Sequence, residues 1–207
     1  APQVQEDGSV DYHELNIVVT VEVGDPLMRK HLLEEGQPGM TVTGMSLPAE
    51  PGEDKSLKEN YGSEISPEDP NLLIAKVAGK PIKGINFVRV EKAFTVREVG
   101  VETGNINFAG SVIVLGSVMD GFSVKAKGSI DVFGSVEGSN LEAGGNIWVR
   151  GGIVGHGRAK IISQKSIKAK FIDNAMVVAN YDLMVAEYLQ HCDTRVAGAV
   201  YVGILGG

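Results

Sequence analysis

Apolar residues alternate with other residues through the second half of the chain, and the alternation recurs in units of similar length. Six units align on their first apolar residue, with spacings of 18, 17, 20, 16 and 17 residues. The aligned residues are Val112, Ile130, Ile147, Ile167, Leu183 and Val200. Alternation of period two predicts short strands, and its repetition at this interval predicts a solenoid.

A second alternating pair closes each unit. The pairs are Val124 with Ala126, Leu141 with Ala143, Ile161 with Ser163 and Val177 with Ala179, whereas Val196-Ala197 fits the fifth unit only after a shift of one residue. Stacking of such units predicts a parallel β-helix of about five to six turns over residues 101–207. The unequal turn lengths disfavour the hexapeptide left-handed form and favour a right-handed coil. Gly116, Gly134 and Gly151 recur at one position, which indicates a corner with positive φ or a close backbone approach.

Residues 1–100 follow a different pattern, which predicts a small β-rich domain. Ile17–Val23 is β-branched and predicts a strand, and residues 40–44 predict another. Three further apolar runs predict a small antiparallel sheet, and they are residues 72–77, 85–90 and 94–96. Residues 45–71 are rich in proline, glycine and carboxylates, so we expect an acidic and mostly irregular loop there.

One short helix is expected over residues 26–35. Asp25 suits an N-cap, Pro26 suits the first helical position and Gly36 suits the stop. The predicted fold class is therefore mainly all-β, with a right-handed parallel β-helix preceded by a small β-rich domain that holds one short helix.

The charges divide at the same point as the pattern. Residues 1–100 hold 17 acidic and 10 basic side chains, whereas residues 101–207 hold 9 of each. A net charge of −7 argues against nucleic acid as a partner, because binding phosphates requires clustered basic residues. No apolar run approaches the roughly 20 residues that span a bilayer, and no signal-peptide pattern is visible. The lone Cys192 fits a reducing compartment.

Catalytic, metal and cofactor sites find no support in the residue pattern. The four histidines lack metal-ligand spacing, and the paired glycines are not followed by the Lys-Ser/Thr of a phosphate loop. His191 and Cys192 are adjacent on a predicted strand, so their side chains point to opposite faces. We therefore expect no enzyme, no cofactor and no metal.

The residue pattern of the solenoid favours an interaction surface over a catalytic, metal or cofactor site. Trp148 lies between two inward residues and should point outward, where it would suit a binding hot spot or pack against another part of the chain. The only basic cluster comprises Arg158, Lys160, Lys165, Lys168 and Lys170. It would meet an acidic partner or anionic lipid headgroups at the membrane periphery, or be simply solvated.

The far end of the solenoid, Val200–Gly207, is apolar and uncharged, so it makes a poor cap for the open strand edges. We expect further chain or a second subunit there, which leaves a homo-oligomer open. A rival hypothesis is a polysaccharide-binding or polysaccharide-cleaving β-helix, which needs clustered carboxylates. The carboxylates of the repeat are scattered over different turns, namely Asp120, Asp131, Glu137, Glu142 and Asp173.

Several motifs resemble the flagellar assembly protein A family of bacteria. They are Pro38–Gly44, Gly104–Gly110, Leu141–Ile153 and Lys168–Ala175, and the resemblance runs from about Ile17 onward. The resemblance implies a cytoplasmic protein, located at the cell pole or at the membrane periphery, that takes part in assembling or placing the flagellum. It implies protein partners from that machinery and offers no catalytic residue to carry over. The β-helix also resembles that of the self-associating bactofilins.

Overall fold

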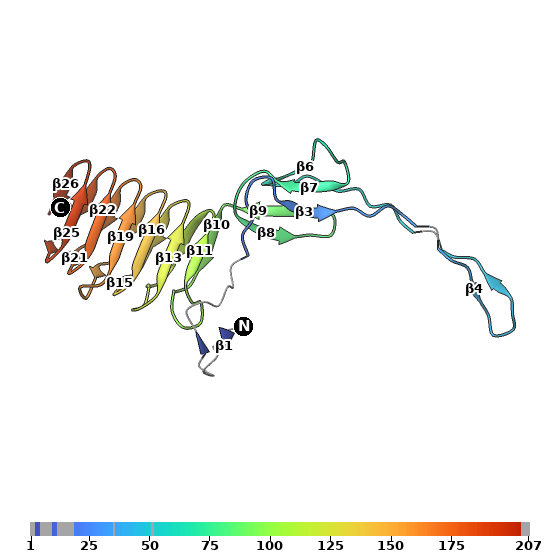
Figure 1. Ribbon diagram of the computed structural model, residues 1–207, viewed down its shortest axis with the longest axis horizontal. Coiled ribbons are helices and arrows are strands. Elements are labelled where there is room, and N and C mark those ends of the chain that lie inside the picture. Colours follow the sequence, from blue (N-terminus) through green and yellow to red (C-terminus); the bar gives the residue numbers. More distant parts are fainter. Residues whose placement is uncertain (1–2, 5–9, 12–18, 35, 51, 204–207) are drawn as a thin grey trace. The chain divides into compact units, whose positions relative to one another are not determined.

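The computed structural model describes residues 3–4, 10–11, 19–34, 36–50 and 52–203. The chain divides into two units (Figure 1). The first comprises Ala1–Val21, Ala78–Lys80 and Glu91–Gly207, and the second comprises Glu22–Val77 and Pro81–Val90. Every regular element of the described residues is a strand, which confirms the all-β class.

The first unit is a parallel β-solenoid with three sheets, as Figure 1 shows for its successive coils. The seven-stranded sheet contains β10 (Ala93–Val96), β12 (Ser111–Val114), β14 (Ile130–Val132), β17 (Ile147–Val149), β20 (Ile167–Ala169), β23 (Leu183–Val185) and β26 (Val200–Val202). The six-stranded sheet contains β11 (Ile106–Phe108), β13 (Ser123–Ala126), β16 (Asn140–Ala143), β19 (Lys160–Ser163), β22 (Met176–Ala179) and β25 (Asp193–Val196). The four-stranded sheet contains β15 (Val136–Glu137), β18 (Ile153–Val154), β21 (Ile172–Asp173) and β24 (Leu189–Gln190).

Register across the coils confirms the predicted alignment. Along the seven-stranded sheet, each aligned residue pairs with the one in the next coil, in the order Val112, Ile130, Ile147, Ile167, Leu183 and Val200. The closing pairs align along the six-stranded sheet, where Thr194 and Val196 continue the column without the expected one-residue shift. One coil buries five apolar side chains, which are Ile130, Val132, Val136, Leu141 and Ala143. Full burial of each larger one contributes roughly 1.5–3 kcal/mol.

The recurrent glycines mark close backbone approaches. A Cβ on Gly134 would lie 2.6 Å from the carbonyl oxygen of Gly116, and one on Gly151 would lie 2.5 Å from that of Gly134. Positive φ occurs at other corners instead, at Gly138, Asn174 and His191. Of the two reasons considered for these glycines, the close approach is therefore the one that applies.

A polar ladder follows one corner of the solenoid. In five successive steps, a side-chain oxygen accepts a hydrogen bond from a backbone N–H of the next coil, at 3.0–3.3 Å. The acceptors are Ser111, Ser129, Asn146, Ser166 and Asp182, and the last donor is the N–H of Ala199. The ladder gives half-buried corner amides a partner and fixes the register between coils.

The second unit contains short antiparallel strands. β3 (Pro26–Arg29), β7 (Leu72–Ala75) and β6 (Ser63–Ile65) form one sheet, with β7 in the middle. β8 (Lys80–Lys83) pairs with β9 (Val88–Glu91), and β4 (Gly39–Met40) pairs with β5 (Ser46–Leu47) as a hairpin. β1 (Gln3–Val4) and β2 (Val10–Asp11) belong to the first unit and pair with each other near the chain start.

The predicted helix over residues 26–35 is wrong. The Asp25 carboxylate accepts the N–H of Glu22 at 2.8 Å, so it closes a turn on its N-terminal side instead of capping a helix. Pro26–Arg29 then pairs with β7, and this pairing overrides the local helix signals.

Three strand predictions also need correction. Of residues 40–44, only Met40 lies in a strand, β4, and the others form the turn that leads to β5. In the described part of Ile17–Val23, Val21 forms only an isolated bridge with Gly79. Phe94–Val96 pairs in parallel with β12 and is the first strand of the solenoid, so it does not join the antiparallel sheet. The first coils also bury aromatic residues, and the Phe94 and Phe108 rings lie 5.7 Å apart.

Candidate protein-interaction face

The outer surface of the seven-stranded sheet carries one column of side chains that alternate with the core. In register, the outward residues are Asp131, Trp148, Lys168, Met184 and Tyr201. Ile147 and Val149 on either side of Trp148 are fully buried, whereas Trp148 is 49% exposed. Alternation along a strand whose neighbours face the core is what directs the indole outward.

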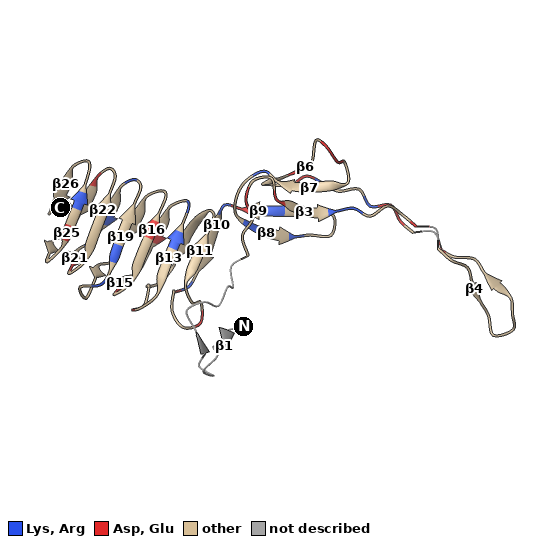
Figure 2. Cartoon of the chain, in the orientation of Figure 1, with Lys and Arg blue, Asp and Glu red and all other residues tan. Residues whose placement is uncertain are grey.

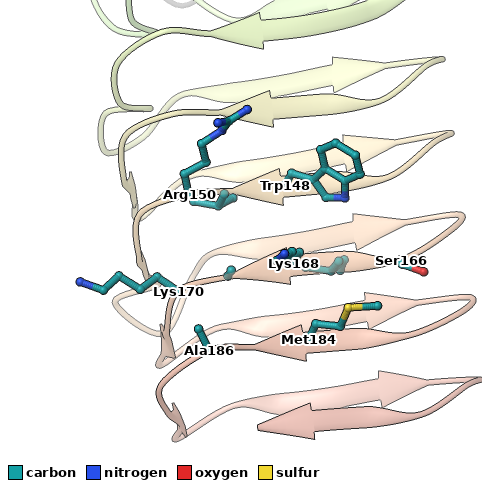
Figure 3. A pocket seen from close by; sticks show the side chains of 10 residues that line it. Trp148, Arg150, Ser166, Lys168, Lys170, Met184 and Ala186 are labelled. Atoms are coloured by element: carbon teal, nitrogen blue, oxygen red, sulfur yellow. The ribbon is translucent and has the colours of Figure 1, made fainter. Parts of the chain in front are cut away.

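A second column lies one residue beyond each strand, and it contains Phe133, Arg150, Lys170 and Ala186. The Arg150 guanidinium lies 3.8 Å from the centre of the Phe133 ring and pairs with the Asp131 carboxylate at 3.2 Å. Both contacts hold Arg150 toward the preceding coil, and Figure 3 shows the Arg150 side chain extending in that direction. The Lys170 ammonium lies 3.4 Å from the Glu187 carboxylate.

A hollow of about 560 Å³ opens between these columns, and we call it the Trp148 hollow. Its lining side chains come from three successive coils and include Trp148, Arg150, Lys168, Lys170, Met184 and Ala186 (Figure 3). Lys168 occupies the coil between Trp148 and Met184, so an ammonium emerges between two large apolar side chains. Lys168 has no ion-pair partner among the described residues. Ala186 is small, which leaves room beside Lys170.

The five predicted basic residues do not share one face. Lys168 and Lys170 belong to the Trp148 hollow, whereas Lys160 is on the outside of the six-stranded sheet and Lys165 lies in the segment between the two sheets. Arg158 precedes β19 and forms an ion pair with Asp120. Figure 2 colours Lys and Arg blue, and the blue positions are distributed over several coils. The structure therefore brings Trp148 together with two of the five and leaves three apart.

The carboxylates of the solenoid are mostly paired with basic groups on other coils. Glu142 pairs with Lys125 at 3.0 Å, and Asp173 contacts the His191 imidazole at 3.2 Å. The described residues contain no group of three or more His, Cys, Asp or Glu side chains that could hold a metal ion. Within this part of the chain, the polysaccharide hypothesis gains no carboxylate cluster to support it.

Comparison with protein families divides the chain between residues 85 and 92, next to the start of the solenoid strands at β10. Residues 92–207 match the Flagellar Assembly Protein A β solenoid domain, and residues 1–85 match the Flagellar Assembly Protein A N-terminal region. The chain belongs to the flagellar assembly protein A family. Searches of curated proteins and of solved structures give no significant match.

Motifs that carried the resemblance fall on defined parts of this flagellar assembly protein A chain. Pro38–Gly44 includes β4 and most of the turn after it, whereas Leu141–Ile153 runs from β16 through β17 into β18. The second motif thus contributes to all three sheets, with Trp148 at its centre. No helix that could span a membrane occurs among the described residues.

Of the six side chains named above for the Trp148 hollow, sequence reasoning missed Arg150, Met184 and Ala186. A usable signal existed for Met184. The alignment that stacks Ile147, Ile167 and Leu183 places the next residue of each, including Met184, in one outward column. Arg150 and Ala186 follow the strands, where alternation no longer predicts direction.

Proposed function

We propose that this protein is a non-enzymatic scaffold of bacterial flagellar assembly or placement, and that it acts by binding other proteins. Membership of the flagellar assembly protein A family supports a role in flagellar assembly. The observation that carries the mode of action is the Trp148 hollow, in which an exposed indole, a thioether and an ammonium without an ion pair lie on neighbouring coils.

Binding at this face has a physical basis. Tryptophan and methionine are enriched at protein interfaces because they bury large apolar areas, and tryptophan is frequent among hot spots. The strands beneath are paired on both sides by neighbouring coils, so the backbone needs little ordering when a partner binds. The Lys168 ammonium would select a partner that carries a carboxylate near its apolar contact residues.

We place the protein in the cytoplasm, at the pole or the membrane periphery, with partners from the flagellar assembly or polar-placement machinery. Self-association through the far end of the solenoid stays a prediction. The apolar and half-exposed Val200 and Val202 of β26 support it.

The test replaces the chromosomal gene of the source bacterium with a Trp148→Ala variant and counts flagellated and motile cells. We expect fewer of both at unchanged protein level, because Trp148 is half-exposed and its loss removes a binding contact without opening the core. Tyr181→Ala is the matched control, since Tyr181 is 61% exposed and lies outside the Trp148 hollow. Normal flagellation and motility after deletion of the whole gene would refute the proposed function.

A further inference from the structure

The tip of the β4–β5 hairpin in the second unit, residues 39–47, exposes an unusually apolar surface. The tip lies within residues 36–49, which contain no charged side chain. Four of its apolar side chains are more than half exposed, which are Met40, Val42, Met45 and Leu47. Figure 1 shows the hairpin, with β4 labelled, as a narrow two-stranded ribbon. An exposed apolar surface of this kind usually marks a binding site.

The apolar side chains surround the tip and do not line a single face of it. Met40 pairs with Ser46 across the hairpin, so these two side chains share a face. Leu47 follows Ser46 in β5 and points to the opposite face, because directions alternate along a strand. Val42 lies in the turn and is fully exposed. A protein partner on one face would leave the other face in water, whereas the hydrocarbon of a bilayer reaches both faces and the apex at once.

Polar groups of the turn bond to one another. The Thr41 N–H donates to the Met45 carbonyl at 2.8 Å, and the Met45 N–H donates to Thr41 Oγ1 at 3.0 Å. The Gly44 N–H donates to the Thr41 carbonyl at 3.0 Å, and the hydroxyls of Thr41 and Thr43 share a hydrogen bond of 2.9 Å. Internal hydrogen bonds of this kind lower the cost of moving a turn out of water, because lipid offers no partners of its own.

The nearest carboxylates in the sequence lie far from the apex. Glu34 and Glu50 are each eight residues from Val42 along their own arms of the ribbon, which is roughly 20–25 Å when extended. An interfacial element sinks about 5–10 Å into the boundary between headgroups and acyl chains. The carboxylates therefore stay about 10 Å or more outside this boundary, where salt largely screens their repulsion from anionic lipid.

We propose that the β4–β5 tip inserts into the interfacial layer of a lipid bilayer. Burial of the four apolar side chains drives insertion, and attraction to anionic headgroups has no part in it because the tip carries no basic residue. No other strand of the described residues covers the outer edges of β4 and β5. At this shallow depth their backbone groups still reach water and headgroups, and the carboxylates further along the ribbon oppose deeper entry.

Insertion of the tip deepens the proposed location at the membrane periphery, and it rests on the proposed function for its role in the cell. It uses residues of the second unit, whereas the Trp148 hollow belongs to the first unit. The membrane contact and the protein contact can therefore be removed separately.

Flotation of the full chain with lipid vesicles tests the proposal. The vesicles consist of phosphatidylcholine, alone or mixed with phosphatidylglycerol, at physiological and at high salt. The parent chain should float with both kinds of vesicle and stay bound at high salt, because apolar burial does not depend on headgroup charge. Val42→Asp places a charge at the fully exposed apex and should weaken binding to phosphatidylcholine vesicles at least about tenfold. Ile85→Asp is the matched control, since Ile85 is 87% exposed and lies outside the hairpin, and it should bind like the parent.

Four results would overturn the proposal. The first is a parent chain that does not bind phosphatidylcholine vesicles, and the second is a Val42→Asp chain that binds them like the parent. The third is binding that requires phosphatidylglycerol and disappears at high salt, which would assign the contact to basic residues elsewhere. The fourth is self-association without vesicles that Val42→Asp abolishes, since a second copy would then cover the tip.

The vesicle assay and the cellular assay fail independently. Normal flagellation after deletion of the gene, with tip-dependent vesicle binding intact, would refute the proposed function and leave insertion standing. Loss of motility in Trp148→Ala cells, with no vesicle binding by the parent chain, would do the reverse.

Discussion

Replacing Ile147 with alanine should destabilise the solenoid by about 3–5 kcal/mol. Ile147 is fully buried and lies in register between Ile130 and Ile167, which are themselves buried. Its own N–H bonds the Ser166 carbonyl at 3.0 Å, and the Ile130 N–H bonds the Asn146 carbonyl at 2.9 Å. These backbone hydrogen bonds fix the spacing of the three coils, so the cavity left by the lost side chain collapses little. The loss of unfolding free energy therefore falls in the upper part of the range for such substitutions.

Val200 provides the comparison, because it occupies the same column in β26 but is 48% exposed. Val200→Ala should cost about 1 kcal/mol or less, since only part of the side chain leaves a packed environment. Lys168→Ala, one residue beyond the buried column, should change the free energy of unfolding by less than about 0.5 kcal/mol.

Urea unfolding followed by far-ultraviolet circular dichroism measures the three free energies, and amide hydrogen exchange shows whether the loss is local to the substituted coil. Exchange matters here because solenoids can open coil by coil instead of in one step. If Ile147→Ala costs no more than Val200→Ala, stacking of this inward column is not a main source of stability and the reasoning fails.

Three further substitutions test what the polar ladder, the glycine corners and Trp148 each contribute to stability. Ser129→Ala removes the acceptor of the Asn146 N–H and should cost about 1–3 kcal/mol, with faster exchange of the Asn146 amide in nuclear magnetic resonance spectra. Gly134→Ala places a Cβ 2.6 Å from the Gly116 carbonyl oxygen and should lower the melting temperature by at least about 4 °C, and an unchanged melting temperature would contradict the close approach. Trp148→Ala should alter the free energy of unfolding by less than about 1 kcal/mol, so a larger loss in chemical unfolding would mean that the indole is structural.

The sequence pattern located the strands of two sheets of the solenoid but not those of the third, and the reason is physical. In the seven-stranded and six-stranded sheets, each strand shows at least two inward residues that alternate with outward ones. Strands of the four-stranded sheet are two residues long and give the core a single inward residue, such as Val136 or Ile153. One apolar residue between two turns has no periodicity, so no pattern marks it as a strand.

Local signals failed where pairing with distant residues decided the outcome. The residues around Pro26 look like a helix start, yet their partner is β7, more than 40 residues away. The Trp148 hollow was equally beyond sequence reasoning, although Trp148 and Lys168 were identified. Its shape depends on Arg150 being held by Phe133 and Asp131, and on the small Ala186 two coils further on.

Coil lengths in the solenoid vary from 16 to 20 residues between aligned positions, yet each coil advances the axis by one strand spacing. Extra residues, such as those at Gly155–Arg158 before β19, extend a coil sideways and leave the axial advance unchanged. Separation along the surface is therefore counted in coils and not in residues. Trp148 and Met184 stand two coils apart, roughly 9.5 Å along the axis, and insertions into the intervening turns would preserve that interval. The number of coils between two outward side chains therefore sets their axial spacing, whatever the length of the turns between them.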